Sequence, residues 1–235
     1  MSAHYDATPK PFIFWDTCAL LDAIRFLARQ GSLTTFRSIS SISEMIHTGK
    51  VYSLASELTI KEWNDHVDEA EVELLNYLRK VTFSHEATLK VVNHLYSSSF
   101  TTVSLENHYL NSIFDNITKT IIQGSIFISE APDFHLKAYD RVAQKLPPAS
   151  KKNEAKDCTI WETVLNVAGK IQAKKPCYPI NGVFFTSNTD DFVKKDKMQF
   201  YPSLLKESHD RHFCCCMNYE DSMQSLLHIM GDWGI

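Results

Sequence analysis

Acidic residues stand at several places along the chain where a strand or helix is expected to begin or end. Asp16 follows the apolar run 12–15, which is short and aromatic like a buried strand. The other acids are Glu62 in a long helical stretch, Asp157 at a helix start, and Asp190 and Asp191 after another apolar run. Carboxylates without evident cationic partners suit the hard cations Mg²⁺ and Mn²⁺. The set therefore predicts a divalent-metal site, of the kind that can activate water in phosphoryl transfer.

Each of these acids also has a simpler explanation when it is taken alone. Asp16 could cap the helix that follows it, which is a common role for Asp. Glu62 could be a solvated surface charge, and Asp157 could favour the dipole of the helix that it begins. Asp190 and Asp191 lie in an Asn-Thr-Asp-Asp segment, where turns favour such residues. It is the joint pattern of acids at comparable positions that favours the metal site.

The hydrophobic pattern alternates between the spacing of strands and that of helices. Short apolar runs predict strands at 12–15, 51–54, 182–186 and 212–217, and a brief strand or turn at 124–129. Apolar residues three or four apart predict helices at 20–28, 60–81, 86–97, 106–122, 133–145, 156–171 and 219–230. The serine-rich patches at 38–43 and 97–102 are short enough to be caps and turns.

This order of elements predicts the fold class. Strands and helices alternate at both ends of the chain, and helices dominate the middle, which indicates a three-layer α/β/α sandwich with a mainly parallel central sheet. We expect one domain over residues 1–235, with 85–150 a largely helical insertion and basic loop. If the strands before Asp16 and Asp190 run parallel in one sheet, their acids lie at the same edge.

Composition limits the classes of protein that the chain can belong to. It has 235 residues, of which 44% are hydrophobic, and a formal net charge of −4, so no general basic field indicates nucleic acid. Six cysteines without a Cys-x-x-Cys pair argue against a zinc module or a disulfide framework. Because no apolar run approaches about 18 residues, we expect no membrane span and a soluble, cytoplasmic protein.

A local excess of basic residues precedes Asp157. Residues 141–156 include Arg141, Lys151 and Lys152 and contain one acid, Glu154. Cations beside a carboxylate cluster would offset the repulsion of an approaching phosphodiester. The alternative is a solvated loop, which is the commoner state of a lysine-rich stretch.

Several enzyme classes lack their required residues here. A haloacid-dehalogenase-type phosphatase also begins with a strand and an Asp, but it needs a second Asp at the position of Cys18. Cys18 itself has no evident His partner for nucleophilic catalysis, so a small buried residue is the simpler interpretation. The chain has no P-loop, no Gly-rich dinucleotide motif and no G-x-S-x-G elbow.

The order and spacing of the acidic motifs resemble those of the PIN-domain nucleases over nearly the whole chain. The strand ending in Asp16-Thr17 is similar to the family's opening motif, and Glu62 resembles its helical acid. Asp157 matches the acid that opens a later helix, and residues 184–192 match the final strand and turn. Arg141, the proline pair at 147–148 and the following lysines are similar to a variant with a basic loop before the third acid.

The resemblance implies a metal-dependent endonuclease that cleaves RNA or single-stranded DNA, as a toxin or defence effector. Its catalytic residues would be Asp16, Glu62, Asp157 and Asp191, which with Asp190 would bind one or two Mg²⁺ or Mn²⁺ ions. The residues expected to contact substrate are Thr17, Arg141, Lys151, Lys152, Ser187 and Asn188. The expected products carry 5′-phosphate and 3′-hydroxyl ends.

Asn188 is a departure from the family pattern, because many relatives have an acid soon after the last strand. Asp191 is the preferred fourth acid, with Asn188 as a neutral ligand or substrate contact. One fewer charge weakens a second metal site, which leaves open an alternative function: a catalytically silent PIN-like module that binds nucleic acid or protein. An inhibitory or effector-complex protein partner and an oligomer are also compatible with the sequence.

Overall fold

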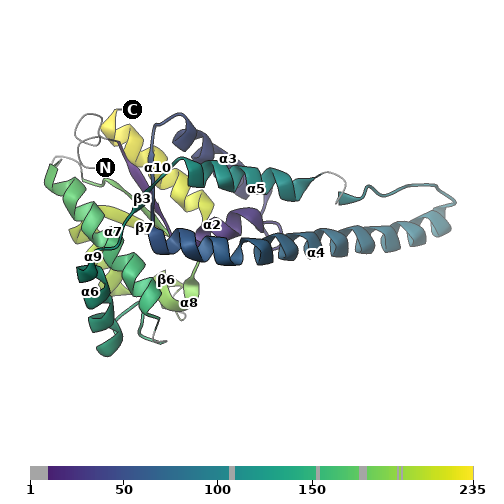
Figure 1. The fold of residues 1–235 in the computed structure, drawn as a ribbon. Coiled ribbons are helices and arrows are strands. Elements are labelled where there is room, and N and C mark those ends of the chain that lie inside the picture. Colours follow the sequence, from purple (N-terminus) through teal and green to yellow (C-terminus); the bar gives the residue numbers. More distant parts are fainter. Residues whose placement is uncertain are drawn as a thin grey trace.

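The computed structural model describes residues 10–105, 109–151, 154–174, 179–194, 196 and 198–234. A five-stranded sheet lies at its centre, in the order β3-β2-β1-β4-β7, and every neighbouring pair of strands is parallel (Figure 1). The strands are β1 (Phe12–Trp15), β2 (Tyr52–Ser56), β3 (Ser125–Ile128), β4 (Gly182–Phe185) and β7 (Phe213–Cys216). Trp15 pairs with Ala55 on one side and with Phe185 on the other, so the carboxyl ends of these strands form one edge.

Helices cover both faces of the sheet. The helices are α2 (Thr17–Ile24), α3 (Leu33–His47), α4 (Glu57–Tyr96), α5 (Leu110–Gln123), α6 (Pro132–Ala143), α7 (Ala155–Lys174), α8 (Thr189–Phe192), α9 (Pro202–Asp210) and α10 (Tyr219–Trp233). The side chains of β1 alternate between two hydrophobic clusters. Ile13 and Trp15 pack with α2, α3 and α10, whereas Phe12 and Phe14 pack with α7 and α9. The expected three-layer α/β/α sandwich with a parallel sheet is therefore confirmed.

Most predicted elements are present, with informative differences. The helices expected at 60–81 and 86–97 form the single helix α4, because the residues between them contain no Gly or Pro to end it. The serine-rich patch at 38–43 lies inside α3, whose serines are compatible with a helix held by buried Ile39, Ile42 and Ile46. Helix α9 and the hairpin of β5 (Val193–Lys194) and β6 (Gln199–Phe200) were also not predicted. Strand β3 confirms the brief strand, and it lies within residues 85–150.

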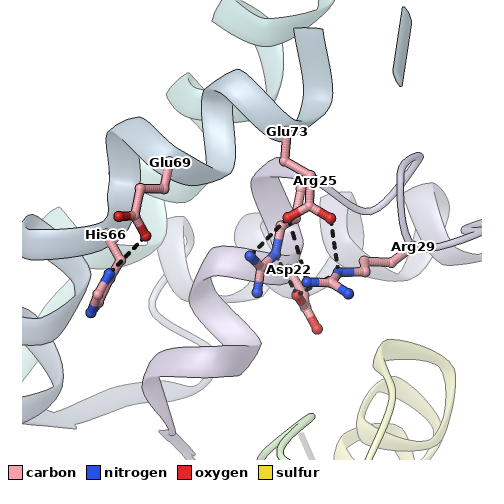
Figure 2. A network of polar contacts seen from close by, with 6 residues as sticks. All are labelled: Asp22, Arg25, Arg29, His66, Glu69 and Glu73. Carbon is pink, nitrogen blue, oxygen red and sulfur yellow. Dashed lines mark hydrogen bonds and ion pairs between the residues drawn. The ribbon is translucent and has the colours of Figure 1, made fainter. Parts of the chain in front are cut away.

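Helix α4 projects well beyond the sheet and its covering helices (Figure 1). Its 40 residues span about 60 Å at the rise of an α-helix. An ion-pair network fixes its first half to α2: Arg25 contacts Asp22 at 2.9 Å and Glu73 at 3.0 Å, and Arg29 contacts Glu73 at 3.3 Å (Figure 2). Among the described residues, no helix is both long and apolar enough to cross a membrane.

Candidate active site

Asp16 lies at the carboxyl edge of the sheet, between β1 and α2. Trp15 pairs with Phe185 at the ends of β1 and β4, so Asp16 lies beside Thr186, the residue that follows β4. The Thr186 hydroxyl donates a hydrogen bond to Asp16 Oδ2 at 2.6 Å. Asp16 is only 1% exposed. Burial is the main cause that raises the pKa of its carboxyl to about 6, and the charge of Glu62 adds to it. The carboxyl therefore lies in a place that disfavours its own negative charge.

Glu62 reaches the same edge from the first turns of α4. The start of this helix is fixed by Ser56, whose side chain accepts a hydrogen bond from the Thr59 amide at 3.0 Å. Glu62 accepts a hydrogen bond from Thr17 Oγ1 at 2.8 Å and forms an ion pair with Lys156 at 2.9 Å. Glu62 is thus held by Thr17, which follows Asp16, and by Lys156, which precedes Asp157.

Asp157 lies in the first turn of α7 and faces the other acids. The pKa of its carboxyl rises to about 8, first because it is buried and then because of the charges of Asp16, Asp191 and Glu62. Asp157 therefore lies within electrostatic range of acids that are far apart in the sequence. The simpler explanation, in which Asp157 only favours the dipole of its helix, does not account for its half-buried position near three other acids.

Asn188 connects the remaining acids. Its side-chain amide donates to Asp157 Oδ2 at 3.1 Å and to Asp191 Oδ2 at 3.2 Å. Its carbonyl oxygen accepts from the Asp191 amide at 3.3 Å and so caps the short helix α8. Asp191 is buried and turned into the site, whereas Asp190 is exposed. Of the adjacent pair, Asp191 is therefore the member placed with the other acids.

Two buried oxygen atoms at this edge have no hydrogen-bond partner among the described residues. They are Oδ1 of Asp191 and Oγ of Ser187. A buried polar atom without a partner is costly, and such atoms concentrate where a ligand completes the site. These two atoms point to a ligand that accepts electron pairs or donates hydrogen bonds.

The expected basic contacts lie differently from the acids. Arg141 is only 8% exposed, and its guanidinium donates to Glu162 at 2.5 Å, to the Pro147 carbonyl at 2.9 Å and to Glu207 at 2.6 Å. The guanidinium of Arg141 is thus occupied by internal partners that were not evident from the sequence, and its contact with substrate stays a prediction. Lys151 donates to the backbone carbonyls of Asp190 and Val193. Lys152 lies outside the described residues.

Thr186 and Lys156 belong to the site but were not predicted as members of it. The signal for Thr186 is its place directly after β4, equivalent to that of Asp16 after β1. Lys156 precedes Asp157, and its ammonium is the cation that offsets the charge of Glu62. Both residues position acids, and neither role can be predicted from the sequence, because each depends on which elements are neighbours in the fold.

The residues present fit a divalent cation. The donor set consists of carboxylate oxygens and the Ser187 hydroxyl, and Mg²⁺ and Mn²⁺ prefer such hard oxygen ligands. A bound cation would lower the raised pKa values of Asp16 and Asp157 and would give the unpartnered oxygen of Asp191 a partner. Among the described residues, no group of three or more His, Cys, Asp or Glu side chains lies in an arrangement that could hold a metal ion, and the Asn188 amide hydrogen-bonds two of the acids.

A comparison with protein families identifies the class of protein. A PIN-domain family model matches residues 13–192, from β1 to the end of α8, and this span includes all the acids of the site. The chain belongs to the PIN-domain family, whose members are generally nucleases. Searches of the curated proteins and of the solved structures found no match.

Proposed function

We propose that this protein is a metal-dependent endonuclease that cleaves RNA or single-stranded DNA. The observation that carries the proposal is the convergence of Asp16, Glu62, Asp157 and Asp191 at the carboxyl edge of the parallel sheet. Open α/β sheets bind their ligands at this edge. The family membership supports the same class of chemistry.

The residues divide into those that would bind metal and those that position them. Asp16, Asp157, Asp191 and Glu62 would hold one or two Mg²⁺ or Mn²⁺ ions. When bound, such an ion would offset the charge of the phosphodiester and make water more acidic. Thr186 fixes the Asp16 carboxylate, and Thr17 and Lys156 fix that of Glu62. The unpartnered Ser187 hydroxyl can donate to a substrate oxygen. We expect products with 5′-phosphate and 3′-hydroxyl ends.

Cleavage of labelled single-stranded RNA and DNA in Mn²⁺, Mg²⁺ or EDTA tests the assignment. We expect metal-dependent cleavage that falls by about 100-fold or more in Asp16→Asn and Asp157→Asn, because each removes a ligand charge. The exposed Asp210→Asn serves as the matched control and should keep full activity. Undiminished cleavage in both site variants, or 2′,3′-cyclic phosphate ends, would contradict the proposal.

A second function is favoured by one specific feature. Asn188 places an amide between Asp157 and Asp191 where an acid is common, so the chain could bind nucleic acid or protein without cleaving. Binding of labelled RNA that persists in every metal, without any cleavage, would support this silent module. A cytoplasmic location, a role as toxin or defence effector, and a protein partner that inhibits the enzyme or joins it in an effector complex stay predictions from the sequence.

A further inference from the structure

The second half of α4 is exposed on most of its circumference. We call residues 79–96 of this helix the arm; the last buried residue of α4 is Leu78, which precedes it. The arm carries large apolar side chains in contact with water, with Phe83 74% exposed, Val91 59% and Leu95 68%. Apolar side chains gathered on one projecting element are typical of a surface that another macromolecule covers.

One face of α4 continues from the first half of the helix into the arm. Asp65, Val72, Phe83 and Lys90 are all exposed and follow one another at steps of 7, 11 and 7 residues. These steps correspond to about two, three and two turns of an α-helix, so the four side chains lie along one line. We call this line the exposed face of α4.

Charge is divided along the same helix. Residues 57–73 carry seven acids against Lys61, whereas the arm carries Arg79, Lys80 and Lys90 against Glu86. The acids Asp65, Asp68 and Glu69 are exposed, and Glu69 contacts His66 on the same helix at 3.0 Å (Figure 2). An acidic half followed by a basic half is complementary to a copy of itself that runs in the opposite direction.

We propose that the exposed face of α4 binds the same face of a second copy of this chain, with the two helices antiparallel. Val72 and Phe83 lie equally far from the midpoint between Tyr77 and Leu78, and so do Asp65 and Lys90. A two-fold axis at this midpoint places Val72 against Phe83 of the second copy, and Asp65 against its Lys90. Such an interface uses one patch on both copies, as two-fold dimers do.

The composition of the face favours a second copy over nucleic acid. The acids of the first half repel phosphates. The exposed aliphatic side chains of Val72 on this face, and of Val91 and Leu95 elsewhere on the arm, can pack against protein but cannot stack on bases as aromatic rings do. The inference does not depend on the nuclease assignment, because it concerns residues that lie outside the cluster of catalytic acids.

Light scattering after size-exclusion chromatography tests the dimer at micromolar concentration. The wild-type chain should have about twice the 26.9 kDa mass of one copy, and this mass should fall as salt is raised. Phe83→Glu, which places a charge in the centre of the face, should be monomeric. Its exposed position predicts no loss of folding, which circular dichroism verifies.

Charge reversal tests the antiparallel arrangement directly. Asp65→Lys with Asp68→Lys places positive charge where Lys90 of the second copy would lie, and Lys90→Glu with His94→Glu places negative charge where its Asp65 would lie. Each double variant should be monomeric alone, whereas their equimolar mixture should recover the dimer mass, because residue 65 of each copy then again faces an opposite charge at residue 90 of the other. A monomeric wild type, or variants that remain dimeric, would overturn the proposal. A monomer whose binding to single-stranded RNA requires Lys90 and Phe83 would assign the arm to nucleic acid instead.

Discussion

At the scale of single residues, Asn188 determines how the site exists without metal. Its amide donates to both Asp157 and Asp191 and so lowers the repulsion between carboxylates that burial and neighbouring charge already disfavour. The same amide supplies no negative charge for a cation. We therefore expect Asn188 to favour a stable metal-free protein and to weaken the affinity for a second ion.

Asn188→Asp should reverse this balance. The substitution removes two donated hydrogen bonds and adds a like charge, so we expect the free energy of unfolding in EDTA to fall by about 1–3 kcal/mol. Added Mn²⁺ should then raise the melting temperature by more than it does in the wild type, because the ligand set carries one more charge. Thermal melts over a Mn²⁺ titration measure both effects.

The matched control is Asn116→Asp, an exposed position on α5. It should change neither the stability in EDTA nor the response to Mn²⁺ by more than about 0.5 kcal/mol. If Asn188→Asp is as stable as the wild type in EDTA and gains nothing from Mn²⁺, the amide does not have the role inferred here.

The acids of the site could be predicted from the sequence, but their supports could not. Asp16, Asp157 and Asp191 follow strands or open helices, and such positions are visible as changes in hydrophobic pattern, whereas Glu62 lies within a helix and was singled out by the family resemblance. Arg141 has partners 21 and 66 residues away, and nothing in its own segment indicates them. An arginine can form a buried ion pair or contact a phosphate, so only the fold shows which of the two roles Arg141 has the partners for.

At the scale of elements, Arg141 joins α6 to α7 and α9. Its guanidinium contacts Glu162 on α7 and Glu207 on α9, and Glu207 also accepts from Trp161 at 2.6 Å. The side chains of Arg141 and Glu162 are each 10% exposed, so solvent compensates neither charge well. The network fixes α7, the helix whose first turn carries Asp157.

Arg141→Ala should therefore act on stability. Removing one partner of a buried ion pair leaves the other charge uncompensated, so we expect a loss of about 3–5 kcal/mol in the free energy of unfolding. The exposed Lys137→Ala on the same helix should change it by less than about 0.5 kcal/mol. Urea denaturation measures the difference. A small loss of stability with a large, selective loss of RNA affinity would restore the substrate contact that the sequence suggested.

The strands were easier to predict from the sequence than the helices that extend from them. Buried strands such as β1 and β4 are short, apolar and bounded by polar residues, and their pattern needs no partner to be recognised. Helix α3 has serines between its apolar residues, which is typical of caps and turns, and its capping box of Ser32 and Thr35 lacks the usual Glu. Its stability comes from packing on α5 and α10, which the local sequence does not display.

At the scale of the whole molecule, a net charge of −4 and a cluster of buried acids give nucleic acid little general attraction. Affinity must then come from a few local cations. Lys156 is already paired with Glu62, and Arg141 is buried in its own network. Of the basic residues in the segment that precedes Asp157, we consequently expect Lys151 and Lys152 to contribute most to the affinity for nucleic acid.

Replacing Lys151 and Lys152 by Ala should weaken binding of single-stranded RNA and reduce the slope of log affinity against log salt by about 1 for each lysine that contacts a phosphate. Fluorescence anisotropy in the Asp157→Asn background, which prevents cleavage, measures the slope, with the exposed Lys206→Ala as control.

Lys151 also holds the backbone carbonyls of Asp190 and Val193, at 2.8 and 3.1 Å, beside Asp191. Lys151→Ala in the otherwise wild-type enzyme should thus lower cleavage as well as affinity, whereas Lys152→Ala should lower affinity alone. An unchanged slope in the double variant would show that these lysines are solvated and that the molecule attracts its substrate through other cations.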